Sequence, residues 1–166
     1  EQDYKRIAHI SGPQHLKIFK ARLEGYKAAL KKNGIPFDPR LVYTGDVSIE
    51  AGRNAVQYFL ELPDPPDAVF AVEDFTALGA IKELKHNNIS IPKDFGIIGF
   101  ANESFGEHIS PSLSTIDQQT VTMGKEAFLL MLELIEEKSN KRGPVQKRIL
   151  DPIPVFRNSS LRNSVS

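Results

Sequence analysis

The chain has 166 residues, which is enough for one domain with a hydrophobic core and too few for two domains of ordinary size. Hydrophobic residues make up 40% and charged residues 25% of the sequence, which is typical of a globular protein and argues against extensive disorder. Lysine plus arginine and aspartate plus glutamate both number 21, so a net charge of zero gives no long-range attraction to nucleic acid or to an anionic membrane. Cysteine is absent, which excludes disulfides, thiolate catalysis and cysteine metal sites. No apolar stretch approaches the length that spans a membrane, so we expect no membrane partner.

The chain begins with a short apolar run, residues 6–11, which predicts a strand that ends at Gly12 and Pro13. From His15 onward, apolar residues recur at spacings of three and four, which predicts one buried face of a helix. The residues on this face are Leu16, Phe19, Leu23, Tyr26 and Leu30. Asn33 and Gly34 end the predicted helix.

A second strand is predicted over residues 41–44, and a second helix follows it. Ser48 is the expected N-cap of that helix, and Pro63 stands just beyond its end. Its predicted buried residues are Ala55, Tyr58, Phe59 and Leu62.

Residues 67–72 predict a third strand, and Asp74 or Thr76 is the expected cap of the helix that follows. Residues 95–100 and 113–116 predict two further strands, with a long polar loop between them. Strands separated by helices of ten or more residues are typical of βαβ units. The predicted fold class is therefore α/β, with three α/β/α layers around a mainly parallel sheet.

The last fifty residues follow a different pattern. A long helix is predicted over residues 121–138, followed by a polar linker over residues 138–144. Two extended runs, residues 145–150 and 153–156, complete the chain.

Polar side chains follow the third and fourth predicted strands directly. In open α/β sheets, ligands bind beyond the carboxyl ends of the strands, so Glu73, Asp74 and the loop from residue 101 to 112 are candidates for a binding site. The expected role of Asp74 as a helix cap is the simpler explanation for that residue. No nucleophile elbow, phosphate-binding loop or zinc-ligand spacing is present, so we predict no catalytic residue, no metal ligand and no cofactor.

Several separated segments resemble the LacI/GalR family of bacterial transcription regulators. They are residues 6–13, 22–26 (Arg-Leu-Glu-Gly-Tyr), 67–80, 91–100 (Ile-Pro-Lys-Asp-Phe-Gly-Ile-Ile-Gly-Phe) and 110–117 (Ser-Pro-Ser-Leu-Ser-Thr-Ile-Asp). The resemblance implies the effector-binding region of such a regulator, with a periplasmic-binding-protein-like fold of two lobes. Residues 1–118 would form one lobe, and residues 119–166 would cross over and return to the other lobe, whose first half would precede Glu1.

The resemblance also implies partners and a mechanism. A small-molecule effector, sugar-like in most relatives, would close the two lobes and change how a homodimer presents its DNA-binding heads to operator DNA. The heads are absent here, so we expect this chain not to bind DNA alone and the whole protein to be a cytoplasmic regulator, not an enzyme. The apolar face of the last helix would be covered by a second copy or by the intact second lobe.

Arg22 matches the family arginine that donates hydrogen bonds to effector hydroxyls or carboxylates, a role that suits its rigid fork of donors. The alternative is a solvated arginine paired with Glu24. Glu73 stands where relatives usually carry asparagine, and an ionised carboxylate only accepts hydrogen bonds. It therefore favours a ligand rich in donors, such as a polyol, or a cationic one.

The sequence departs from the family at two expected contacts. Ala101 replaces an aspartate that clamps sugar hydroxyls, so Asn102 or Glu103 would have to take that role. Val47 replaces an aromatic residue and cannot stack on a ring. Gln118 matches a glutamine near the hinge, although a solvent-facing amide is an equal alternative.

Two other functions remain open on the sequence. A periplasmic solute-binding protein of a transporter would share the clamp, and a signal peptide upstream would distinguish it from a regulator with a helix-turn-helix. A small sugar hydrolase or isomerase would need paired acids, for which Asp46, Glu73 and Glu103 are the candidates.

Overall fold

The computed structural model describes residues 2–136 and 146–162. Four parallel strands form one sheet in the order β2-β1-β3-β4. Their bounds are β1 (Ile7–Ser11), β2 (Val42–Thr44), β3 (Ala68–Ala71) and β4 (Gly96–Ile98). Successive strands are joined by α1 (Lys17–Lys32), α2 (Ile49–Leu60) and α3 (Asp74–His86), with a short 3-10 turn (Pro39–Leu41) before β2. The predicted α/β fold with a mainly parallel sheet is confirmed.

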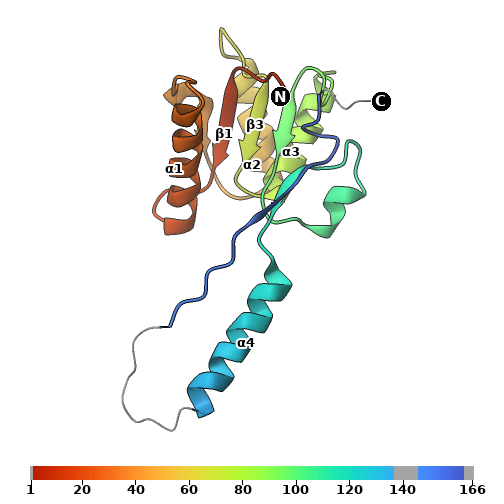
Figure 1. Ribbon diagram of the computed structural model, residues 1–166. Coiled ribbons are helices and arrows are strands. Elements are labelled where there is room, and N and C mark those ends of the chain that lie inside the picture. Colours follow the sequence, from red (N-terminus) through yellow and green to blue (C-terminus); the bar gives the residue numbers. More distant parts are fainter. Residues whose placement is uncertain (1, 137–145, 163–166) are drawn as a thin grey trace.

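The strand order places the helices in two layers. The chain steps outward from β1 to β2 and then back past β1 to β3 and β4, and right-handed crossovers in opposite directions lie on opposite faces of a sheet. Accordingly α1 lies on one face and α2 with α3 on the other (Figure 1). The hydrophobic core fills the α2–α3 side. Its largest fully buried members are Ile10, Val56, Phe59, Leu84, Ile97 and Leu113.

Helices α2 and α3 approach each other closely at two glycines. A Cβ atom on Gly52 would lie 2.0 Å from the carbonyl oxygen of Thr76, and one on Gly79 would lie 1.9 Å from that of Ile49. Both distances are far below van der Waals contact, so only glycine permits this helix spacing. The two helices therefore pack with their backbones in direct contact on one face of the sheet.

Beyond the main sheet, two short strands cross side by side. β5 (Thr115–Asp117) pairs antiparallel with β6 (Ile153–Val155), and single bridges join Ile98 to Ser114 and Ala101 to Asp117. Along the chain, the long helix α4 (Thr120–Glu136) lies between β5 and β6. It extends away from the sheet (Figure 1), and none of its residues is buried. Residues 146–150 run back beside α4, where Arg148 forms ion pairs with Glu126 and Glu133 of that helix. No helix in residues 2–136 or 146–162 is long and apolar enough to cross a membrane.

The predicted elements are found, with shifted ends. β4 is shorter than residues 95–100, and β5 lies slightly later than residues 113–116. Residues 146–150 form no strand, whereas residues 153–155 do. The predicted linker over residues 138–144 lies outside the described part of the chain. Tyr58 was predicted to be buried but is 38% exposed, because it packs on the outer side of α2 against Tyr43.

The two helix caps that could be predicted had different outcomes. Ser48 caps α2, since its hydroxyl accepts a hydrogen bond from the Ala51 amide at 3.1 Å. The prediction that Asp74 or Thr76 caps α3 is wrong. Glu73 is the cap, and its carboxylate accepts hydrogen bonds from the amides of Phe75 and Thr76.

Candidate functional site

Arg22 reaches from α1 to the carboxyl end of β3. Its Nη1 donates a hydrogen bond of 2.6 Å to the carbonyl oxygen of Val72, and its guanidinium carbon lies 3.8 Å from the centre of the Phe100 ring. Burial lowers the pKa of Arg22, and the nearby carboxylate of Glu73 acts in the opposite direction. An arginine stays charged under either influence, so a cation with unused donors is held at this strand end.

Glu73 supplies an acceptor at the same strand end. Its Oε2 accepts hydrogen bonds from the amides of Phe75 at 2.7 Å and Thr76 at 3.4 Å. Burial raises the pKa of Glu73, and these two amides act against that rise. Within the described residues, Oε1 has no hydrogen-bond partner, so one oxygen remains for a donor from outside the chain.

Asp74 is fully buried, and both of its oxygens are engaged within the protein. Oδ1 accepts a hydrogen bond of 2.7 Å from the Thr115 hydroxyl, and Oδ2 accepts one of 2.8 Å from the Glu103 amide. A Cβ atom on Gly99 would lie 2.1 Å from Oδ1, so glycine is needed there. Asp74 thus ties α3 to β5 and to the loop after β4. Its predicted contact with a ligand stays a prediction.

The loop after β4 has an unusual backbone held by consecutive amides. Ala101 has a φ of 138° and Asn102 a φ of 58°, both uncommon outside glycine. The Ala101 amide donates to Ile116 O at 3.0 Å, and the Asn102 amide donates to the Thr115 hydroxyl at 3.2 Å. Together with the Glu103 amide, these bonds fix the loop. Such strained residues cluster at functional sites.

The remaining predicted site residues lie at the same edge of the structure. Val47 follows β2 and Gln118 follows β5, both partly buried, whereas Glu103 is exposed. Within the described residues, no hydrogen bond joins Val47 or Gln118 to the other candidates, so their ligand contacts stay predictions. The same part of the chain holds no group of three histidine or acidic side chains that could bind a metal.

Two aromatic features of this region were not predicted as site components. Phe100 ends the β4 segment and forms the surface on which Arg22 lies. His9 of β1 is fully buried between the rings of Tyr26 and Phe70, with ring centres 5.2 and 4.9 Å away. The partners of both residues are distant along the chain, so local periodicity does not identify them.

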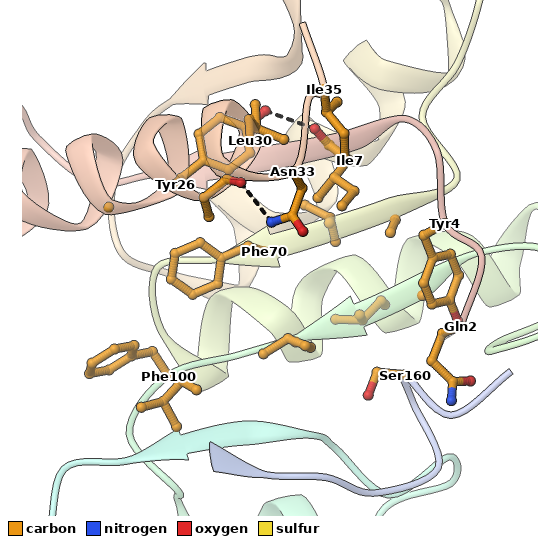
Figure 2. Close-up of a pocket in the computed structure, with 18 of the residues that line it drawn as sticks. Gln2, Tyr4, Ile7, Tyr26, Leu30, Asn33, Ile35, Phe70, Phe100 and Ser160 are labelled. Atoms are coloured by element: carbon orange, nitrogen blue, oxygen red, sulfur yellow. Dashed lines mark hydrogen bonds between the residues drawn. The ribbon is translucent and has the colours of Figure 1, made fainter. Parts of the chain in front are cut away.

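A groove of about 680 Å³ runs from Arg22 and Phe100 along the α1 face of the sheet to Tyr4 (Figure 2). Its walls include Ile7, Tyr26, Leu30, Phe70, Ile98 and Ile116. The volume lies in the range of small-molecule sites, but such sites place several polar groups around the ligand. The groove is lined mostly by apolar side chains, and Arg22 is the cationic residue that reaches from it to the strand ends, beside Glu73. The strand ends are therefore the candidate binding site, and the rest of the groove is an apolar hollow on the α1 face of the sheet.

Comparison with known proteins agrees with this geometry. The sequence model of the periplasmic binding protein-like domain matches residues 1–160. The transcriptional repressor CytR of Escherichia coli is 39% identical over 160 residues, which are 96% of this chain and 46% of the repressor. The transcriptional regulator CelR of Thermobifida fusca is 33% identical over 135 residues, which are 81% of this chain and 40% of that protein.

Solved structures show the same relationship. A LacI transcriptional regulator from Bacillus cereus has a TM-score of 0.87 at 30% identity, covering 95% of this chain and 55% of that one. The complex of the regulator CelR with cellobiose has a TM-score of 0.84 at 32% identity, covering 95% of this chain and 47% of that one. The chain thus spans less than half the length of these curated relatives. It belongs to the periplasmic binding protein-like domain family, and the relatives that it resembles over this domain are LacI-type transcription regulators.

Proposed function

We propose that this chain binds a small-molecule effector at the carboxyl ends of β3 and β4 as part of a LacI-type regulator. The observation that carries the proposal is the placement of Arg22, which is held by Val72 O and the Phe100 ring beside Glu73. A cation with free donors next to a carboxylate with a free oxygen suits a ligand that both accepts and donates hydrogen bonds. Sugars have this chemistry, and a related regulator was solved with cellobiose.

We further propose that residues 1–118 form one lobe of the effector domain and that residues 119–166 cross over to a second lobe, to which α4 belongs. Two uncovered apolar surfaces support this division. On α4, Val121 is 72%, Phe128 56% and Ile135 67% exposed, whereas a helix this apolar is normally buried. An apolar groove opens along β3 and β4 on the α1 face of the sheet, although parallel sheets are normally covered on both faces. Relatives about twice as long have enough chain to cover both surfaces.

The proposed regulator acts as a cytoplasmic homodimer that binds operator DNA through a separate domain. An exposed aromatic side chain at the start of α3, packed against a partly buried one in the loop after β4, supports dimerisation. Phe75 is 43% exposed and lies 4.9 Å from the ring of Phe105, and aromatic side chains are enriched in the centres of protein interfaces. The zero net charge of this chain supports assigning DNA contacts to another domain.

A thermal-shift screen tests the proposal, using a protein extended to the length of the relatives. Sugars, sugar phosphates, nucleobases and polyamines are the panel. A ligand at about 100 times its Kd should stabilise the folded state by about 2.7 kcal/mol. Arg22→Ala should weaken binding by at least about tenfold, because a charged hydrogen-bond donor is lost. Arg40→Ala is the matched control, since Arg40 is an exposed arginine paired with Asp38.

Two outcomes would contradict the proposal. One is a ligand whose affinity is unchanged by Arg22→Ala but lost on substitutions elsewhere. The other is a folded, extended protein that no member of the panel stabilises.

A further inference from the structure

We propose that Asn102 couples the binding loop to both crossover strands, with Asp117 and Arg157 as the residues that position it. The inference rests on the proposed function only in treating the loop after β4 as the binding loop. The coupling itself is a property of the hydrogen bonds. It would make loop geometry and the disposition of the crossover strands depend on each other.

The Asn102 side chain lies between a pure donor and a pure acceptor. Its Oδ1 accepts a hydrogen bond of 3.0 Å from Arg157 Nη2, and its Nδ2 donates one of 3.2 Å to Asp117 Oδ2. Arginine can only donate and an ionised carboxylate can only accept, so the partners fix the orientation of the amide. Asn102 also has a left-handed backbone, which asparagine tolerates better than most residues. No other side chain would satisfy all three requirements equally well.

Each positioning residue is itself anchored in a crossover segment. Asp117 ends β5, and its Oδ1 accepts a hydrogen bond of 2.6 Å from the Gln119 amide. The Gln119 side chain in turn donates to Asp151 O at 2.6 Å, just before β6. Arg157 follows β6, and its Nη1 donates to Leu113 O at 2.8 Å. The loop residue is therefore bonded to both segments that lead to and from α4.

The geometry has a consequence for movement of the crossover strands. If β5 and β6 shift relative to each other, Asn102 cannot keep both partners in the same geometry, and the strained loop loses one of its restraints. A ligand that requires the restrained loop would then favour one disposition of the strands, and the strands would favour the ligand equally.

Amide hydrogen exchange measured by NMR on the 166-residue chain tests the coupling without any ligand. In Arg157→Ala, exchange at the Ala101 and Glu103 amides should accelerate about tenfold, although their own acceptors are untouched. In Asn102→Gly, which keeps the left-handed backbone accessible, exchange at the Gln119 amide should accelerate similarly. Amides of β1 and β3 should be unchanged in both variants, and Arg40→Ala should leave the loop as in the wild type.

The double variant separates coupling from independent support. If one network restrains both the loop and the crossover strands, the loop and Gln119 amides in the double variant Arg157→Ala with Asn102→Gly should exchange no faster than in the faster single variant. Multiplied rate increases, an effect confined to the side of each substitution, or equal acceleration in β1 and β3 would each overturn the proposal. Because no ligand takes part, failure of the effector-binding proposal would leave these results unaffected.

Discussion

Acidification should destabilise this fold through the buried imidazole of His9. The Nδ1 atom lies 2.8 Å from the Phe70 carbonyl oxygen, which can only accept, so Nδ1 carries the proton and Nε2 is a bare acceptor. Nε2 is buried without a hydrogen-bond partner among the described residues. A second proton would therefore place an unpaired charge inside the protein. Burial accordingly lowers the pKa of His9 from 6.5 to about 4, the hydrogen bond to Phe70 opposes this shift, and Arg22 adds to it.

The size of the effect follows from these two pKa values. Between pH 6.5 and about 4, the unfolded chain binds a proton at His9 and the folded chain does not. The contribution of neutral His9 to the free energy of unfolding is therefore fully present above pH 6.5 and falls as the pH drops through this window. At about 1.36 kcal/mol per pKa unit, the loss is about 1 kcal/mol near pH 5.5 and about 2–3 kcal/mol near pH 4.5. Below the folded pKa it levels off at about 3 kcal/mol.

Urea unfolding of the wild type and of His9→Leu, near pH 7.5, 5.5 and 4.5, measures this loss. Leucine removes the hydrogen bond to Phe70 at every pH, which adds a constant offset, so only the change of the difference with pH is informative. As the pH falls, the free energy of unfolding of His9→Leu should decrease less than that of the wild type. The difference should equal the amounts above, because the two proteins share all other acid-sensitive groups. His108→Asn, at a side chain that is 74% exposed, is the control and should follow the wild type. A difference between wild type and His9→Leu that stays constant over this pH range would refute the reasoning.

Two further predictions concern the helices. Gly79→Ala should destabilise the fold by about 2–3 kcal/mol, because the new methyl group would overlap the Ile49 carbonyl oxygen. Gly25 lies in the exposed middle of α1, where nothing lies within 4 Å of an added Cβ, so Gly25→Ala should stabilise the fold by about 0.5–1 kcal/mol. Equal effects of the two substitutions in chemical denaturation would show that the helix spacing is not set by contact. Ser48→Ala should cost about 1 kcal/mol by removing the cap of α2, and Ser48→Asp should retain most of it. An equal loss of stability in Ser48→Ala and Ser48→Asp, measured by thermal unfolding, would argue against the cap.

The repeating part of the fold was predictable because burial follows the period of each element. Tyr26 and Leu30 on α1 and Phe59 on α2 are buried, as their spacing indicates. The ends of the strands were less accurate, because β4 ends where Gly99 must pass Asp74. That constraint comes from another element and leaves no local pattern.

The candidate site could be located from the sequence, but the contacts of its residues could not. Strand ends identify where Glu73 and Asp74 lie, but two adjacent acids look alike in sequence. Asp74 points inward because Thr115 and the Glu103 amide are there to receive it, which leaves Glu73 to cap α3. The roles of Asn102 and Arg157 likewise depend on a contact between segments that are far apart in the chain.

The attachment of Arg22 at two points would affect recognition in the proposed effector site, as well as the position of the side chain. A free arginine side chain has about 2 kcal/mol of rotamer entropy, and in this protein folding has already removed part of it through Val72 O and Phe100. Binding of a ligand to the remaining donors would therefore cost less side-chain conformational entropy than binding to a mobile arginine. The same restraint stops the guanidinium from following acceptors placed elsewhere. Discrimination between stereoisomers would then depend on the fixed directions of the N–H groups, more than on the charge they carry.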